Sequence, residues 1–133
     1  VYNANDEQAN RLHVPRGAEV VSLFRIRFAD NLPISTQLTW LPHHQCQNLL
    51  MHDLANQSLY DILSQEYGHH LSHASTEIRA TLADQRTCEL LEISDPAALL
   101  VSEQTTYLDS GEVIEFTQSQ FPFQSFTLEH QEK

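Results

Sequence analysis

Residues 20–42 read VVSLFRIRFADNLPISTQLTWLP, and this stretch decides the fold. Residues 19–29 are rich in β-branched and aromatic side chains, which favour a strand. The Asp-Asn-Leu-Pro sequence at residues 30–33 is typical of a hairpin turn, and residues 34–41 predict the returning strand. Pro42 ends that strand because it has no backbone N–H to donate. The stretch therefore predicts a hairpin of two antiparallel strands.

Two arginines stand in the first strand of this hairpin. Arg25 and Arg27 are two positions apart, so their side chains leave the strand from the same face. Paired guanidinium groups suit a phosphate or carboxylate, which they grip with forked hydrogen bonds. An exposed strand face, paired with some of the eighteen acidic residues, accounts for the spacing as well. The opposite, core-facing side is expected to hold Val20, Phe24, Ile26 and Phe28.

Turn and helix signals place the other elements. Ser58 and Asp61 resemble a capping box at the start of the clearest helix, and Gly68 supplies its C-terminal stop. A second hairpin is expected around residues 109–112. Helical segments are expected at 4–12, 43–52, 58–67 and 84–91, and strands at 71–82, 99–108, 113–121 and 126–128. This order predicts one α+β domain, residues 1–133, with a largely antiparallel sheet and helices on one side.

A weak internal repeat relates the two hairpins. Shifting the chain by 79 residues, without a gap, places Leu12 on Leu91 and Ile34 on Val113. The shift aligns the helix before each hairpin as well as the hairpin itself. We therefore expect two pseudo-repeated halves whose hairpins meet in one sheet.

The repeat also supplies a control for the arginines. Arg25 and Arg27 fall opposite Gln104 and Thr106 in the second half. The strand therefore does not need arginine at these positions to form, which favours a functional role for the pair.

The composition limits the partners of the chain. Its 133 residues, 41% of them apolar, suit one domain with a single core. Seven basic and eighteen acidic residues give a net charge of −11, so the domain is expected to repel DNA and anionic membranes. No apolar run approaches the roughly 20 residues of a membrane span, and no basic-then-apolar leader opens the chain. Cys46 and Cys88 are expected to be free thiols of a cytoplasmic protein, and the start at Val1 suggests a piece of something longer.

Ser58 and Glu115 are further candidate binding residues. The N-terminus of a helix attracts anions, so Ser58 is of interest if it converges with the arginines and is otherwise an ordinary N-cap. Glu115 shares a predicted strand face with Thr117, Ser119 and Phe121. Such a face either lines a polar pocket, with Glu115 accepting hydrogen bonds from a ligand, or meets solvent.

Eight histidines raise the question of a metal site, but their spacing does not support one. His70 and His73 lie three apart in a predicted strand, which directs them to opposite faces. Surface positions are expected for these two and for His43, His44, His52 and His69. No nucleophile elbow, Gly-rich phosphate loop or Ser/His/Asp spacing is present. The sequence therefore predicts no metal, no cofactor and no enzymatic activity.

Four strings together resemble the UTRA domain, the effector-sensing half of GntR-superfamily regulators of the HutC branch. They are VVSLFRIRFADNLPISTQLTWLP (20–42), SLYDILSQEYG (58–68), IRATLADQRTCELLEI (78–93) and TTYLDSGEVIEFTQSQF (105–121). The resemblance implies a chorismate-lyase-like fold, a small-molecule pocket and homodimerisation through this domain. It also implies an N-terminal winged helix-turn-helix domain that reads DNA, and nothing in this chain corresponds to that domain.

The resemblance also implies roles for individual residues. In relatives that sense sugar phosphates, the positions of Arg25, Arg27 and Ser58 hold the phosphate. Tyr60 completes the Ser-Leu-Tyr string, and Glu115 matches the acid that contacts the sugar.

Two departures bear on the identity of the ligand. Gln37 stands where many relatives have an acid. Phe121-Pro122-Phe123-Gln124 replaces a Tyr-Arg-x-Asp string, which makes the Phe121 end of the pocket more apolar. A phosphorylated sugar and an organic acid both remain open as the ligand.

The sequence thus predicts the effector-binding and dimerisation domain of a bacterial transcription regulator, which senses a small anionic metabolite. A chorismate-lyase-type enzyme of the same fold is the alternative, because a fold alone does not decide function. A dimerisation module that has lost its ligand is a third possibility.

Overall fold

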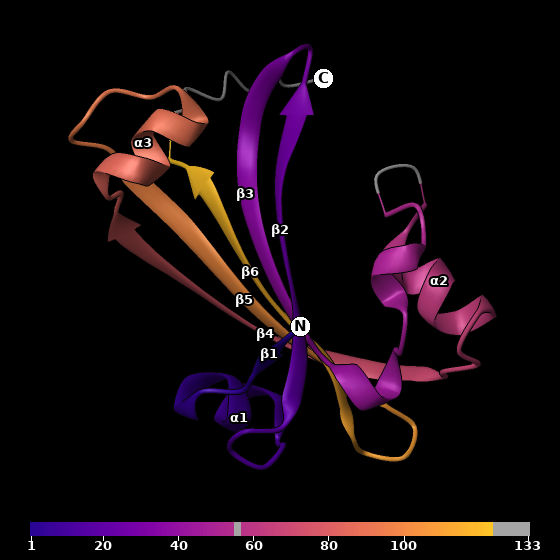
Figure 1. Ribbon diagram of the computed structural model, residues 1–133. Helices are drawn as coiled ribbons and strands as arrows, with labels where there is room; N and C mark the ends of the chain where they lie inside the picture. Colours follow the sequence, from indigo (N-terminus) through magenta and orange to yellow (C-terminus); the bar gives the residue numbers. More distant parts are fainter. Residues whose placement is uncertain (55–56, 124–133) are drawn as a thin grey trace, which may run out of the picture.

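Six strands form one antiparallel sheet in the order β1-β2-β3-β6-β5-β4 (Figure 1). The computed structural model describes residues 1–54 and 57–123, so the strand expected at 126–128 lies outside the described residues. The strands are β1 (Tyr2–Asn3), β2 (Glu19–Ala29), β3 (Leu32–Pro42), β4 (Leu71–Leu82), β5 (Ala98–Leu108) and β6 (Val113–Pro122). The helices are α1 (Asp6–Leu12), α2 (Leu59–Gln65) and α3 (Gln85–Leu91), with two short 3-10 helices, η1 (His43–Gln45) and η2 (Leu49–Met51). The predicted α+β class is confirmed.

The two hairpins differ in the length of their turns. Asp30 and Asn31 have φ angles of 51° and 65°, as a two-residue type I′ turn between β2 and β3 requires. The turn between β5 and β6 is longer: the backbone N–H of Leu108 donates to the carbonyl of Glu112 at 2.8 Å across it. Gly111 in this turn has a φ of 89°, a conformation that strains any side chain.

The predicted repeat is present in the structure. α1 and α3 begin 79 positions apart, and so do β2 and β5. His13 and Glu92, also 79 apart, follow the two helices in the left-handed conformation, with φ angles of 54° and 55°. Each hairpin carries a register shift at the same place, after Arg27 in one half and after Thr106 in the other. The two halves therefore share local irregularities as well as element order.

The 79-residue alignment of the two halves needs one correction, in the strands that follow the hairpin turns. Phe28 pairs with Pro33 in the first half, and the equivalent Tyr107 pairs with Val113 in the second. Val113 therefore corresponds to Pro33 and not to Ile34, because the second turn is one residue longer. The offset between β3 and β6 is accordingly 80 residues.

The helices cover both faces of the sheet, so the expectation of helices on one side was wrong. One buried cluster joins α2 and its flanking turns to Val21 and Leu41, and a second joins α1 to Val20 and Trp40. Side chains that are neighbours along a strand point to opposite faces, so these clusters lie on opposite sides of the sheet. α3 packs on β3 on the α1 side, as Figure 1 also shows. We call the two sides the α1/α3 face and the α2 face.

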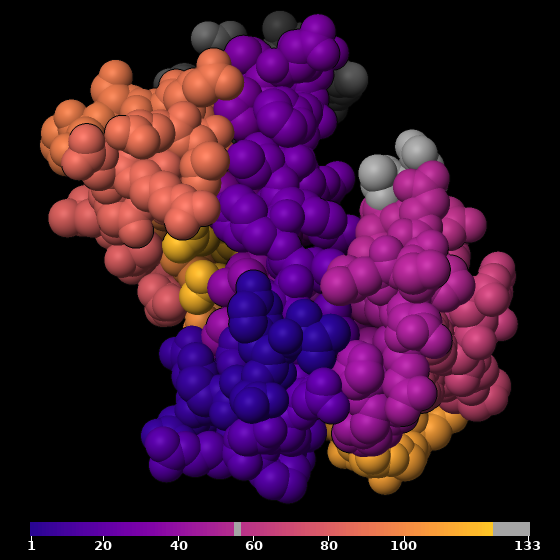
Figure 2. Space-filling view, viewed as in Figure 1, coloured from indigo at the N-terminus to yellow at the C-terminus, as the bar shows by residue number. Residues whose placement is uncertain are grey.

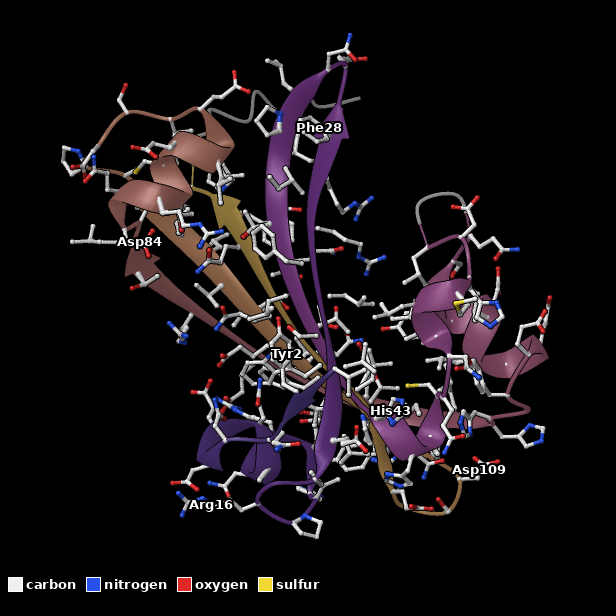
Figure 3. All side chains as sticks on the ribbon, viewed as in Figure 1. Tyr2, Arg16, Phe28, His43, Asp84 and Asp109 are labelled. Carbon is white, nitrogen blue, oxygen red and sulfur yellow. The ribbon has the colours of Figure 1, made fainter. Side chains whose placement is uncertain are left out.

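The outer part of the β2–β3 hairpin extends past the helices. Phe24 and Phe28 lie on the α1/α3 face as expected, but 49% of Phe24 and 60% of Phe28 is exposed. Figure 3 shows Phe28 near the tip of the hairpin. The expectation of a core-facing row therefore holds for Val20 but not for these phenylalanines. Phe24 borders an open cavity beside α3, with its ring centroid 6.0 Å from the Arg86 guanidinium, and Phe28 lies near the tip of the hairpin.

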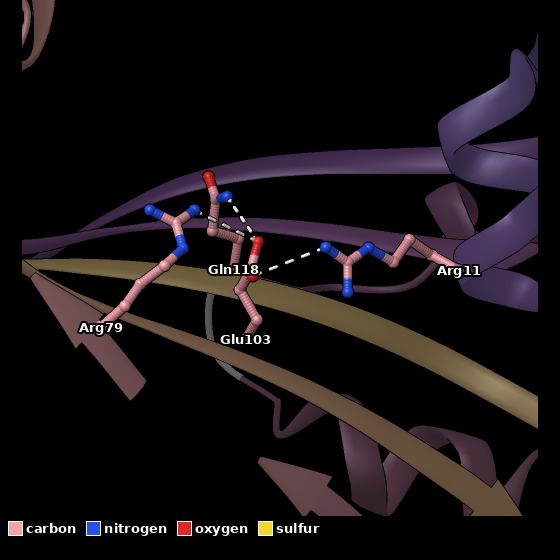
Figure 4. Close-up of polar contacts among 4 residues, drawn as sticks. All are labelled: Arg11, Arg79, Glu103 and Gln118. Atoms are coloured by element: carbon pink, nitrogen blue, oxygen red, sulfur yellow. Dashed lines mark hydrogen bonds and ion pairs between the residues drawn. The ribbon is translucent and has the colours of Figure 1, made fainter. Parts of the chain in front are cut away.

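A polar cluster on the α1/α3 face ties α1 to the far edge of the sheet (Figure 4). Glu103 of β5 is 9% exposed and accepts a 2.9 Å hydrogen bond from Nε2 of Gln118 in β6. Its carboxylate lies 3.5 Å from a guanidinium nitrogen of Arg11 in α1 and 3.6 Å from one of Arg79 in β4. The Arg11 guanidinium also lies over the Phe116 ring, 4.8 Å from its centroid. One carboxylate thus connects four elements of the fold.

Candidate functional site

A cavity of about 380 Å³ opens on the α2 face of the sheet. Figure 2 shows the surface hollowed between the upper β2–β3 hairpin and the segment that holds α2. The lining residues come from β2, β3, α2 and β6, and they are Arg25, Arg27, Gln37, Ser58, Leu59, Tyr60, Glu115 and Thr117. The structure therefore brings together five of the six residues that the sequence singled out for binding.

Arg25 and Arg27 form the cationic end of the cavity. They lie opposite Gln37 and Ser35 on β3, so the strand pairing fixes both guanidinium stems on one face. Nε of Arg25 is buried and has no hydrogen-bond partner among the described residues. Within the described part of the chain, neither arginine pairs with a carboxylate. A buried donor without a partner is costly, and an anion in the cavity would satisfy it.

Ser58 stands at the N-terminus of α2, at the edge of the cavity. Its backbone carbonyl accepts from Ile62 as in an ordinary helix start, but its side chain forms no capping hydrogen bond. The capping box expected with Asp61 is therefore absent, and Ser58 is among the residues that line the cavity. The hydroxyl group is left available to a ligand.

Glu115 forms the acidic end of the cavity and is only 1% exposed. Its Oε1 accepts hydrogen bonds from the Tyr60 hydroxyl at 2.8 Å and from the Thr106 hydroxyl at 2.7 Å. Its Oε2 accepts from the Thr117 hydroxyl. Nε2 of Gln104 donates to the Tyr60 oxygen at 3.0 Å and lies 3.5 Å from Oε1 of Glu115. Burial, followed by the Glu115 charge, raises the pKa of Tyr60 to about 12, so its hydroxyl remains a proton donor at neutral pH.

Sequence reasoning missed two residues of this network and misplaced one. The sequence analysis used Gln104 and Thr106 only as the counterparts of Arg25 and Arg27 in the second half of the repeat. In the structure Gln104 donates a hydrogen bond to Tyr60, and Thr106 donates one to Glu115. Their position opposite Arg25 and Arg27 in the repeat was the available signal. Phe121 is not among the residues that line the cavity; it is 36% exposed and pairs with Leu100 on β5.

Several of the histidines make contacts within the fold. Nε2 of His69 lies 2.6 Å from the carbonyl oxygen of Gln45, which ties the end of α2 to η1. The His73 ring stacks on Tyr107, with 4.7 Å between centroids. Residues 1–54 and 57–123 contain no group of three or more His, Cys, Asp or Glu side chains able to hold a metal ion. No helix in the same ranges is long and apolar enough to cross a membrane.

Fold and cavity together define a class: an α+β domain with a polar cavity between one face of the sheet and the start of a helix. The sequence profile of the UTRA domain matches residues 1–127, and the chain belongs to this family. The family resemblance read from the four sequence strings is thus confirmed.

The relatives are regulators of transcription. The chain is 23% identical, over 128 residues, to the HTH-type transcriptional repressor NagR of Bacillus subtilis. The match covers 96% of this chain and 52% of NagR, so the chain spans about half the length of that protein. It is similar to a GntR-family transcriptional regulator from Enterococcus faecalis, with a TM-score of 0.85, 26% identity, and coverage of 96% and 93% of the two chains. The effector domain of PhnF from Mycobacterium smegmatis has the same fold, with a TM-score of 0.83, 23% identity, and coverage of 90% and 74%.

Proposed function

We propose that this chain is the effector-sensing domain of a GntR-family transcription regulator. Its effector is a small anionic metabolite, of the size of a phosphorylated sugar, held between β2, β3 and the start of α2. A cavity of about 380 Å³ suits a ligand of this size. DNA would be bound by a part of the protein outside this chain, since a net charge of −11 opposes phosphate binding by the domain as a whole.

The arginine end of the cavity carries this proposal. The buried Nε of Arg25 has no partner among the described residues, and the Ser58 hydroxyl is not used for capping. Two guanidinium groups and a hydroxyl beside a helix start form a set of donors without an acceptor. An anion in the cavity would supply the acceptor that the described side chains do not offer to Nε of Arg25.

Thermal-shift screening of the domain against phosphosugars and organic acids tests the proposal. A ligand at a hundred times its dissociation constant stabilises the domain by about 2.7 kcal/mol. The shift should vanish in the Arg25→Ala, Arg27→Ala variant and persist in the Arg16→Ala, Arg79→Ala control, which loses the same charge from exposed positions. A full response from the first variant would refute the site assignment.

Dimerisation is the second part of the proposal, and an apolar strip along β4 supports it. Leu100 pairs with both Ala80 and Phe121, so the three share the α2 face, and Ile78 and Leu82 flank Ala80 on the same side of β4. Ile78 is 71% and Leu82 74% exposed, on the edge strand of the sheet. Exposed apolar patches on an open sheet edge are typical of protein interfaces. A second copy of the chain is the occupant that we propose.

The oligomeric state tests this part separately. Light scattering after gel filtration should give a dimer for the wild type and a monomer for Leu82→Glu. The control Ser75→Glu, on the opposite face of β4, should remain dimeric. A monomeric wild type, or a dimeric Leu82→Glu, would show that the strip is not the interface.

The enzyme alternative has no comparable support. The similar proteins are described as transcription regulators, and Tyr60, with a pKa of about 12, is a poor base at neutral pH. We therefore propose a binding role in the cytoplasm without catalysis. Turnover of chorismate by the purified domain would contradict this.

A further inference from the structure

A second cavity, of about 390 Å³, opens on the α1/α3 face of the sheet, between α3 and the β2–β3 hairpin. We call it the α3 cavity, and its volume is in the range of small-molecule sites. Its lining residues come from β2, β3, β6 and α3 with its cap, and they are Phe24, Thr36, Leu38, Asp84, Arg86, Thr87, Leu90 and Gln120. Phe24 and Arg25 are neighbours along β2 and leave it on opposite faces, so the α3 cavity and the arginine cavity lie on the two sides of one hairpin.

The repeat shows that side chains can span this position. Its shifts, of 79 residues for the helices, β2 and β5 and of 80 for β3 and β6, relate four lining residues to the polar cluster that holds α1: Phe24 to Glu103, Leu90 to Arg11, Leu38 to Gln118 and Thr36 to Phe116. In that half the Arg11 guanidinium reaches Glu103 at 3.5 Å, so side chains bridge the helix and the sheet (Figure 4). The corresponding Leu90 and Phe24 are apolar and cannot form such a bridge. The α3 cavity therefore follows from the side chains of its own half, and the scaffold does not require it.

Three of the lining side chains are apolar. Phe24 comes from β2, Leu38 from β3 and Leu90 from α3, and 49% of Phe24 is exposed. Phe24 and Leu38 pair across the hairpin, so their side chains stand side by side on one face. An apolar group that covers them removes their surface from water, which favours binding.

Two opposite charges and an amide accompany this apolar surface. The Arg86 guanidinium is exposed, and no described carboxylate lies within ion-pair distance of it. Asp84 accepts the backbone N–H of Thr87 at 2.7 Å, and a carboxylate has about four acceptor positions, so it can take a further donor. Oε1 of Gln120 accepts from the Thr36 hydroxyl at 3.2 Å, which leaves its Nε2 as a donor. The cavity thus offers cationic, acidic and apolar groups together.

We propose that the α3 cavity binds a zwitterion with an apolar side chain, the chemistry of a free apolar amino acid. The ligand carboxylate lies at Arg86 and Nε2 of Gln120, and its ammonium group lies at Asp84. The ligand side chain lies against Phe24 and Leu38. A zwitterion suits this cavity better than a simple anion, because the domain has a net charge of −11 and the cavity has a single arginine to oppose it. A simple amine would place a second cation beside Arg86.

Two-dimensional NMR titration of the domain with four probes tests the inference: L-phenylalanine, phenylacetate, phenethylamine and glycine. L-phenylalanine should shift the amide signals of Phe24, Leu38 and Thr87, with a dissociation constant on the order of 1 mM for so few ligand atoms. Phenylacetate lacks the ammonium group and phenethylamine the carboxylate, so each should bind about threefold or more weakly. Glycine lacks the apolar part and should cause no saturable shift.

Two variants test the residues that carry the inference. Phe24→Glu, Leu90→Arg gives the α3 half the charged pair of the other half, so it should abolish L-phenylalanine binding, while unchanged amide signals of α1 report an intact fold. Arg86→Gln should remove the preference for L-phenylalanine over phenethylamine. The control Arg16→Gln, which loses an exposed arginine from another part of the surface, should keep that preference.

The outcomes separate the site from the class of its ligand. The α3 cavity is overturned as a site if L-phenylalanine shifts none of its amides, or binds the folded Phe24→Glu, Leu90→Arg variant as tightly as the wild type. The zwitterion class is overturned if phenylacetate, phenethylamine or glycine binds as tightly as L-phenylalanine. The Arg25→Ala, Arg27→Ala variant should bind L-phenylalanine as the wild type does, because the two cavities share no lining residue. A failure of this inference therefore leaves the proposed anion site untouched.

Discussion

Replacing Glu103 by alanine should destabilise the domain far more than its two half-exposed ion pairs would suggest. Arg11 is 37% and Arg79 52% exposed, so each pair contributes about 0.5 kcal/mol after screening by solvent. The hydrogen bond from Gln118 to the carboxylate contributes about 1.5 kcal/mol, and without it a part-buried amide loses its partner. Together these losses amount to about 2.5 kcal/mol, which lowers Tm by roughly 8–10 °C in a domain of this size.

Urea unfolding monitored by circular dichroism measures the effect. Glu103→Gln keeps an acceptor for Gln118 and should cost only about 1 kcal/mol, a difference that shrinks at high salt. The control Arg16→Ala removes an ion pair to Asp6 whose members are 79% and 74% exposed, and should change the free energy of unfolding by less than about 0.5 kcal/mol. If Glu103→Ala costs no more than this control, the cluster does not hold α1 to the sheet as described.

Two further variants report on the site and the core. Ser58→Ala should leave the free energy of unfolding within about 0.5 kcal/mol of wild type, because no capping hydrogen bond is lost. Ligand affinity should fall about tenfold. A large loss of stability in urea would show that the Ser58 side chain caps α2 after all. Burial raises the pKa of Cys46 from 9.0 to about 12, and that of Tyr60 from 10.0 to about 12. The unfolded chain ionises first, so these two groups should leave stability unchanged below pH 9 and lower it as pH rises from there towards 12. Cys46→Ala should flatten the early part of this decline, and an unchanged slope would contradict burial as its cause.

Local sequence patterns were sufficient for most of the elements. β2 and β4 have the predicted bounds. In β2 a run of β-branched and aromatic residues ends at a turn signal, and β4, of mixed polarity, lies between Gly68 and the helix cap at Asp84. α3 begins after Asp84, whose carboxylate accepts from the backbone N–H of Thr87 at 2.7 Å, as its predicted cap requires. Arg25 and Arg27 share a face and a cavity because a spacing of two in a strand allows no other arrangement.

The errors concern relations between elements. The apolar stripe of α2 shows that one side of the helix is buried, but not which face of the sheet it covers, so helices on both faces were not foreseen. Gln104 and Thr106 carry no charge, and their role depends on Tyr60 and Glu115, which arrive from distant segments. Phe121 was expected in the pocket because it shares a strand face with Glu115 and matches a pocket position of relatives. It does share that face, but it lies further along β6 than the cavity, beside Leu100.

A crystal structure of the domain with the ligand found by screening, or with inorganic phosphate, tests the central claim most directly. We predict an anion within hydrogen-bonding distance, about 3 Å, of Nε of Arg25, with Arg27 and the Ser58 hydroxyl as further donors. An anion bound elsewhere, with the Arg25 Nε still unpaired, would contradict the account.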